Sequence, residues 1–219
     1  MIKKQNVISQ IPTKEVRYKI TATLLNQWQR IFDAKENIYS NDEDTISYEE
    51  KVEIETNKRI EEFVNLLNRI PTPDNEYMKR GREYEDFVCS GLDREFSPII
   101  ENGAFQITLT KKVEIDGLPI LLYGVLDVLK AGRIYDIKRV VRYQSRKYKN
   151  SLQHPMYLFL APSTYDFTYL VCDDKDNHYY ENYIRENCQD ILQVIAQFIS
   201  WLKSRDLFEI FTQKWAIYA

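Results

Sequence analysis

The stretch that decides the fold reads Leu122-Tyr-Gly-Val-Leu-Asp-Val-Leu-Lys-Ala-Gly-Arg-Ile-Tyr-Asp-Ile-Lys138. It contains two mostly apolar runs, within 119–130 and 133–140, and Ala131-Gly132 separates them. Glycine tolerates a positive φ at the second position of a two-residue turn, so this pattern predicts a β-hairpin. We therefore expect two antiparallel strands at the centre of a sheet.

Counting back from the turn places Asp127 directly opposite Asp136, and the two-residue period of a strand puts Lys138 on the same face as Asp136. Directly opposed like charges destabilise a strand pair. A chain that carries them is expected to bring a positive group to the site, and a divalent metal held by oxygen ligands is such a group. Two plainer interpretations stay open: Asp127 is an ordinary exposed strand residue, and Lys138 only pairs with Asp136 on a solvated face.

A third acid lies in the segment 75–96, which we expect to be a helix. Helical spacing places Glu85 on a mostly apolar stripe, whereas Glu83 and Asp86 point away. The other members of the stripe are Met78, Gly81, Val88 and Leu92. Because an acid on an apolar stripe is costly without a partner, Glu85 is predicted to point at the sheet, with Gly81 allowing close approach. The alternative is a salt bridge to a nearby arginine.

A basic run follows the hairpin, although the net charge of the chain is −3. Six basic residues fall within twelve positions: Lys138, Arg139, Arg142, Arg146, Lys147 and Lys149. Tyr143 and Tyr148 are interleaved with them. Such a stretch is typical of phosphate-contacting segments, and a solvated basic face is the equally open alternative.

The remaining periodicity predicts further helices and strands. We expect helices at about 21–32, 47–69 and 152–160 and from about 186 onward, strands at 104–115, 166–172 and 178–184, and an acidic loop at 41–45. Pro155 is tolerated in the third of these helices only in or near its first turn. This order predicts a mixed α/β fold in one domain, with a helical N-terminal part at about 20–97 and a core at about 98–219.

Composition excludes several classes of protein. The chain has 219 residues, of which 44% are hydrophobic, so a real core is expected. No apolar run approaches the roughly 18 residues of a membrane span, and no secretory signal is evident. Three cysteines are too few for a disulfide scaffold, and the two histidines lack metal-ligand spacing. No glycine-rich phosphate loop occurs. A reducing, intracellular compartment is the default expectation.

Five short motifs, in order, resemble the PD-(D/E)XK nuclease superfamily and in particular its RecB-like exonuclease branch of bacteria and phages. They span residues 20–157 and read Ile20-Thr-Ala-Thr-Leu-Leu-Asn-Gln-Trp28, Arg80-Gly-Arg-Glu-Tyr-Glu85, Gly124-Val-Leu-Asp127, Asp136-Ile-Lys138 and Gln153-x-x-x-Tyr157. The resemblance implies a mixed central sheet flanked by helices, a core like that of restriction endonucleases. It also implies a cytoplasmic enzyme with DNA as substrate, and recombination or phage-replication proteins as partners.

The resemblance further implies a role for each matching residue. Mg²⁺ or Mn²⁺ would be held by Glu85, Asp127, Asp136 and the carbonyl of Ile137, and Lys138 would complete the catalytic set. DNA would be contacted by Gln153, Tyr157, Arg139, Arg142, Arg146 and Lys147. The three scattered cysteines make an iron–sulfur cluster unexpected. The expected function is a metal-dependent deoxyribonuclease of the exonuclease type. The alternatives are a catalytically silent nucleic-acid-binding or inhibitory module on the same fold, and an RNA-directed enzyme.

Overall fold

The computed structural model describes residues 15–38 and 46–218, and the predicted hairpin lies at the centre of its sheet. Strands β3 (Leu118–Lys130) and β4 (Arg133–Val140) are joined at Ala131 and Gly132, whose φ values are 49° and 76°. Two consecutive positive φ values are those of a type I′ turn. Lys130 pairs with Arg133, as the sequence predicted.

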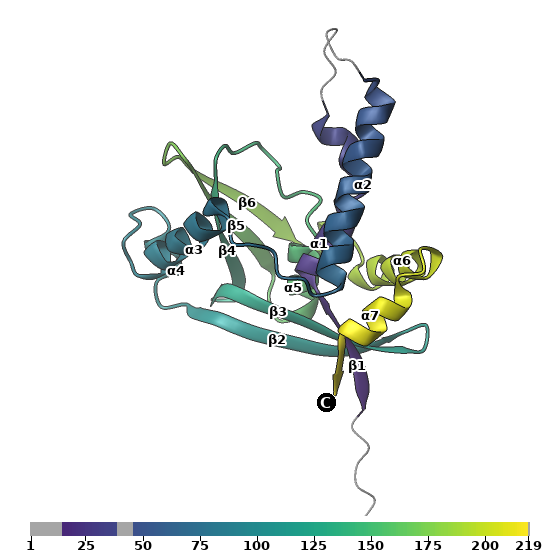
Figure 1. Ribbon diagram of the computed structural model, residues 1–219. Helices are drawn as coiled ribbons and strands as arrows, with labels where there is room; N and C mark the ends of the chain where they lie inside the picture. The colour runs from purple at the N-terminus through teal and green to yellow at the C-terminus, as the bar shows by residue number, and fades with distance from the viewer. Residues whose placement is uncertain (1–14, 39–45, 219) are drawn as a thin grey trace, which may run out of the picture.

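The hairpin belongs to a seven-stranded mixed sheet in the order β6-β5-β4-β3-β1-β7, with β2 also paired to β3. The five strands outside the hairpin are β1 (Val16–Thr21), β2 (Ala104–Ile115), β5 (Asp166–Asp173), β6 (His178–Ile184) and β7 (Ala216–Tyr218). The expected mixed α/β sheet flanked by helices is confirmed (Figure 1). Strands β1 and β7 are absent from the sequence prediction; β1 pairs in parallel with β3 and antiparallel with β7.

Helices follow the predicted segments, and side chains cap several of them. They are α1 (Ala22–Gln29), α2 (Tyr48–Leu67), α3 (Glu76–Cys89), α4 (Ser97–Ile100), α5 (Gln153–Leu160), α6 (Ile191–Ser204) and α7 (Phe208–Lys214), with 3₁₀ turns at η1 (Ala34–Asn37) and η2 (Arg185–Asn187). Thr21 accepts a hydrogen bond from the Leu24 N–H at the start of α1, as an N-cap residue does. The expected acidic loop at 41–45 lies outside the described residues.

The predicted helix at 75–96 is shorter than expected. It ends at Cys89, and Gly91 follows with φ 82°, the left-handed conformation that commonly terminates helices. Asp93 then accepts backbone hydrogen bonds from Glu95 and Phe96 and starts a new turn. Leu92 is therefore no longer on the stripe of Glu85 and is 62% exposed, so that part of the prediction was wrong.

Two hydrophobic cores lie on opposite sides of the sheet. The larger core packs α1, α2, α5, α6 and α7 against one face, and the smaller one packs α3 and α4 against the other (Figure 1). Successive β4 residues alternate between them: Ile134 belongs to the larger core and Tyr135 to the smaller. Within the described parts of the chain, none of the helices combines the length and apolar character needed to cross a membrane.

Candidate active site

Asp127 lies where β3 changes partners. Along one edge of β3, residues 120–123 pair with β1 and residues 128–130 pair with β4. Strand β2 pairs with β3 along its other edge. The segment from Gly124 to Asp127 thus lies between two diverging strands. At this fork the Asp127 Oδ2 atom accepts a hydrogen bond of 3.0 Å from the Ile137 backbone N–H. A side-chain carboxylate therefore continues the contact between the strands beyond their last paired residues.

The strand β3 is also distorted at Asp127. Leu126 belongs to the larger core and Val128 to the smaller, although residues two apart share a face of a regular strand. Gln106 stands opposite in β2 with φ 52°, a conformation that is uncommon for a residue other than glycine, asparagine or aspartate. The regular pairing between β2 and β3 is interrupted there, between Phe105 and Ile107. The fork is a local irregularity that places an acid where a regular strand would not.

Asp136 and Lys138 lie on one face of β4, as predicted. Lys138 Nζ is 2.6 Å from Asp136 Oδ2, and the Asp136 side chain is only 1% exposed. This contact is a short ion pair that favours the ionised forms of both groups. The other carboxylate oxygen, Oδ1, accepts a hydrogen bond of 2.5 Å from Gln153 Nε2. The buried Asp136 is thus held from two elements, β4 and α5.

Glu85 approaches this pair from α3, on the other side of the hairpin. It accepts a hydrogen bond of 2.5 Å from Gln106 Nε2 and is half-buried. Burial and the charge of Asp136 raise the pKa of Glu85. The prediction that Glu85 lies on a buried apolar face of this helix is only partly right, because Val88 is buried but Met78 is 46% exposed. A Cβ atom at Gly81 would meet nothing within 4 Å, so that glycine does not serve close approach.

The three acids act on one another's ionisation. Burial, and then the charge of Asp136, raises the pKa of Asp127 to about 8. Burial also raises the pKa of Asp136, against the opposing effect of Lys138. Burial lowers the pKa of Lys138, but Asp136 and Asp127 outweigh it and hold that pKa above its ordinary value. The three acids therefore favour their protonated forms more than exposed acids do, and the Lys138 ammonium opposes this only in part.

Gln153 and Tyr157 come from one face of α5, and Pro155 sits in the first turn of that helix, where proline is tolerated. The Tyr157 ring lies directly over Gly124, so close that a Cβ atom at that position would be 2.5 Å from Tyr157 Cε1. Burial and the charges of Asp136 and Asp127 raise the pKa of Tyr157. Four of the resembling motifs, those of Glu85, Gly124 to Asp127, Asp136 to Lys138 and Gln153 to Tyr157, thus meet at the fork.

The basic run divides into two parts. Arg139 is engaged with the turn between β5 and β6: its guanidinium is 2.9 Å from Asp176 and 3.8 Å from Asp174. Lys138 belongs to the carboxylate site, and the other four basic residues are exposed on the segment that follows β4, namely Arg142, Arg146, Lys147 and Lys149. Arg139 is therefore less available for a phosphate than the sequence predicted, whereas the other four are accessible.

Two residues at the site, Gln106 and Tyr169, were not singled out from the sequence. Gln106 contacts Glu85, and Tyr169 stacks on Tyr148 of the basic run with ring centroids 4.3 Å apart. Tyr169 also donates a hydrogen bond of 3.2 Å to Ser151 Oγ, at the start of α5. A glutamine inside an otherwise β-forming segment is the only sequence signal for Gln106, and it is weak.

The oxygen donors of the fork suit a hard divalent cation. Mg²⁺ is usually bound in proteins by one or two carboxylates, and water and substrate phosphate complete its shell. Asp127 and Asp136 supply two carboxylates, and the raised pKa of Asp127 indicates that added positive charge would be favourable. Among residues 15–38 and 46–218, however, no three His, Cys, Asp or Glu side chains are grouped so that they could hold a metal ion by themselves.

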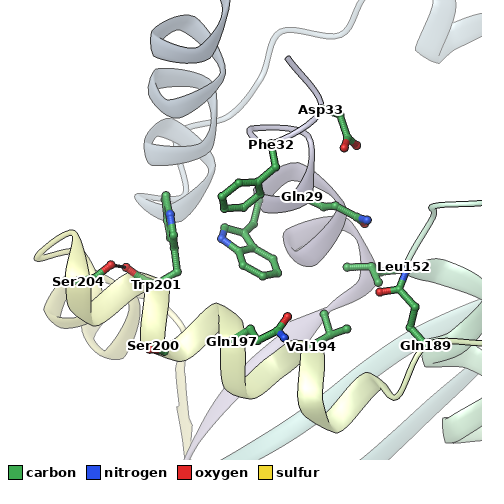
Figure 2. Close-up of a pocket in the computed structure, with 11 residues that line it drawn as sticks. Gln29, Phe32, Asp33, Leu152, Gln189, Val194, Gln197, Ser200, Trp201 and Ser204 are labelled. Carbon is green, nitrogen blue, oxygen red and sulfur yellow. Dashed lines mark hydrogen bonds between the residues drawn. The ribbon is translucent and has the colours of Figure 1, made fainter. Parts of the chain in front are cut away.

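A cavity of about 570 Å³ lies elsewhere, between α1 and α6 (Figure 2). Phe32 and Trp201 both line it, and their rings make an edge-to-face contact with centroids 6.4 Å apart. Among the described residues that line it, Asp33 alone is charged, and none of the predicted site residues contributes to the lining. The cavity is therefore separate from the carboxylate site.

Comparison with protein-family models found no match to this chain, and comparison with curated protein sequences found none either. Among solved structures, that of SSO0001 is similar with a TM-score of 0.52 and 13% sequence identity, over 84% of this chain and 77% of that one. An alkaline exonuclease (LHK-Exo) from Laribacter hongkongensis is similar with a TM-score of 0.46 and 15% identity, over 88% and 89% of the two chains. The same exonuclease in complex with dAMP gives a TM-score of 0.43 and 15% identity, over 90% and 92%. The chain thus shares its fold with SSO0001, and exonucleases are among its structural neighbours.

Proposed function

We propose that this protein is a metal-dependent deoxyribonuclease of the PD-(D/E)XK type, in the RecB-like exonuclease branch. One observation carries the proposal. A buried carboxylate, Asp136, and a partly buried one, Asp127, meet at a fork in the sheet, and Lys138 lies 2.6 Å from Asp136. Burying like charges together is costly, and a structural role alone would be served at less cost by apolar residues.

The proposed ligands of Mg²⁺ or Mn²⁺ are Asp127, Asp136 and the carbonyl oxygen of Ile137, with Glu85 bound directly or through water. The chemistry that a divalent cation held by these residues would supply is the acidification of a water and the stabilisation of negative charge on a phosphate. Gln153 holds Asp136 by its hydrogen bond of 2.5 Å and so keeps one oxygen turned towards Lys138. Tyr157 packs directly over Gly124 and so covers that part of β3.

Lys138 has the position of an electrostatic catalyst. Its ammonium keeps its proton at neutral pH, because Asp136 and Asp127 raise its pKa against the effect of burial. A fixed positive charge beside a phosphate favours the transition state of hydrolysis over the ground state. Arg142, Arg146 and Lys147, all exposed after β4, would contact DNA phosphates. Arg139 would support the site by holding the turn between β5 and β6.

The test is digestion of linear double-stranded, covalently closed circular and single-stranded DNA with Mg²⁺, Mn²⁺ or EDTA. We expect degradation of linear DNA with either metal, none with EDTA, and none by Asp136→Asn. Intact circular DNA beside degraded linear DNA identifies an exonuclease. Binding of DNA without cleavage under every metal condition would instead identify a silent binding module. Preferential cleavage of RNA in a mixed digest would contradict the assignment to DNA.

Metal binding can be measured without cleavage. Calorimetric titration of the protein with Mn²⁺ is expected to show binding that Asp127→Asn weakens about tenfold or more. Glu83→Gln is the matched control, because Glu83 is exposed on α3 and pairs with Lys79 at 3.7 Å. Equal Mn²⁺ affinity in all three proteins would contradict the proposed ligand set.

A further inference from the structure

A second cavity, of about 620 Å³, lies between strand β6 and the segment 143–150. It combines two tyrosine rings, two basic side chains and one acid: Tyr143, Tyr183, Arg146, Lys149 and Glu181. None of the residues of the carboxylate fork lines it. Its mixture of aromatic, cationic and anionic groups suits a ligand that offers a flat ring, a negative group and a hydrogen-bond donor.

Glu181 is the unusual member of this lining. Glu181 is only 7% exposed, and it lies on the edge strand β6. The Oε2 atom accepts hydrogen bonds from the Tyr183 hydroxyl at 2.6 Å and from the Tyr148 backbone N–H at 3.2 Å. The Oε1 atom is buried and accepts no hydrogen bond of good geometry from any residue that the structure describes. The Tyr143 hydroxyl lies close by, and burial together with the Glu181 carboxylate raises its pKa to about 12. A buried carboxylate oxygen without a donor is costly, so this oxygen is suited to a donor that arrives with a ligand.

The aromatic walls are fixed by packing. Tyr143 stacks on Tyr179 with centroids 4.2 Å apart, and Tyr183 stacks on His154 at 3.9 Å. Rings that are already held lose little freedom when a flat ligand packs against them. Arg146 and Lys149 are exposed on the same segment and give the rim a positive charge.

We propose that this cavity binds one unpaired nucleotide of a nucleic-acid strand, and that it prefers a base with an exocyclic amino group. The amino group of adenine, cytosine or guanine would donate to Glu181 Oε1, the base would pack on the tyrosine rings, and a phosphate would lie against Arg146 and Lys149. Thymine has no amino group, and its one free ring donor, N3–H, lies between two carbonyl oxygens that a carboxylate repels. Base stacking of this kind is sequence-tolerant, so the preference comes from Glu181.

Tyr148 connects the cavity to the fork. Its backbone N–H donates a hydrogen bond to Glu181, and its ring stacks on Tyr169. The Tyr169 hydroxyl in turn donates a hydrogen bond to Ser151, just before α5. The inference that the bound nucleotide belongs to the strand being cleaved rests on the proposed function. Binding itself is measured in EDTA without cleavage, so failure of one proposal is distinguishable from failure of the other.

The experiment measures the affinity of the full chain for the single-stranded hexamers dA6, dC6 and dT6 in EDTA by fluorescence anisotropy. We expect dA6 and dC6 to bind about fivefold or more tightly than dT6. A hexamer in which purine, lacking the amino group, replaces adenine should bind as weakly as dT6. This comparison uses the wild-type protein and does not depend on the folding of a variant. Equal affinity for dA6 and its purine analogue would overturn the proposal.

Two variants separate the base contact from the phosphate contact. Glu181→Gln should bring the affinities for dA6 and dT6 within about twofold of each other, and exposed Glu186→Gln is its control. The double variant Arg146→Ala, Lys149→Ala should weaken all three hexamers by a similar factor and leave their ratio unchanged. Lys58→Ala, exposed on α2, controls for the loss of positive charge. A Glu181→Gln protein that melts normally and retains the wild-type ratio would remove Glu181 from the pocket.

Discussion

The Asp127 carboxylate accepts a hydrogen bond of 3.0 Å from the backbone N–H of Ile137, one residue past the position opposite it in the hairpin. The last residues paired in regular register are Val128 and Tyr135. The side chain of Asp127 therefore satisfies a backbone donor where the two strands diverge. The same contact keeps its charge beside Asp136, which raises the pKa of Asp127 in addition to the effect of burial.

Asp127→Asn should therefore change the pH dependence of stability. Its folded pKa of about 8 lies above an ordinary value of about 3.9, so between these pH values the folded state binds the extra proton. Wild-type stability in EDTA should fall as the pH rises through this window. The asparagine variant lacks that titration and should become the more stable protein at about pH 8.5. The free energy of unfolding of the variant minus that of the wild type should be about 1–3 kcal/mol larger at about pH 8.5 than at about pH 4.5. Urea unfolding at the two pH values measures this, and a pH-independent difference would contradict the raised pKa.

Lys138→Ala should lower the rate of cleavage far more than the affinity for DNA. The ammonium lies 2.6 Å from Asp136 Oδ2, and a fixed charge there acts mainly on the transition state. Removing one such group typically costs about two to three powers of ten in rate. Single-turnover cleavage and DNA binding are measured side by side. A variant that melts earlier but cleaves at nearly the wild-type rate would leave Lys138 with a structural role only.

Gly124→Ala should disturb both the fold and the site. The added Cβ atom would lie 2.5 Å from Tyr157 Cε1, so the ring and the helix α5 behind it must shift. We expect a decrease of about 1–3 kcal/mol in unfolding free energy and lower cleavage, because α5 also carries Gln153. Gly81→Ala is the matched control: its Cβ atom would meet nothing within 4 Å, and alanine in the middle of a helix should add about 0.5–1 kcal/mol. Equal stability changes in the two variants would contradict the close packing at Gly124.

Glu85→Gln should reduce metal-dependent cleavage, whereas Glu83→Gln should not. Glu85 is half-buried and receives a hydrogen bond from Gln106, while Glu83 is exposed beside Lys79. Both changes remove one charge from the same helix, so any difference reports on position. Cleavage measured across a series of Mg²⁺ concentrations compares them. Greater damage from Glu83→Gln would show that the other face of α3 meets the substrate.

The triple variant Arg142→Ala, Arg146→Ala, Lys147→Ala should bind DNA more weakly and with a smaller dependence on salt. All three side chains are exposed after β4. For every phosphate that is no longer neutralised by a basic side chain, the slope of log affinity against log salt concentration should become shallower by about 0.7–0.9. Binding across a salt series in EDTA measures the slope. An unchanged slope would mean that these residues form a solvated face.

The sequence by itself determined the hairpin and most of the regular elements. Ala131-Gly132 sets the register through its positive φ values, and this register puts Asp136 and Lys138 on one face and Asp127 opposite. These are local effects: turn geometry and the two-residue period of a strand act over a few residues and can be counted. The pairing of Gln153 with Tyr157 on one helix face follows from helical spacing in the same way.

Tertiary structure alone decided the rest. The short strands β1 and β7 exist because β3 offers an edge to β1, and no local pattern predicts that pairing. Only packing shows that Gln106 adopts a positive φ opposite Asp127 and binds Glu85, and that Arg139 is engaged by the turn between β5 and β6. Glu181 reaches its cavity through the approach of segments more than thirty residues apart. Contacts of this kind depend on how distant segments are brought together, and propensity and periodicity along the chain carry no information about them.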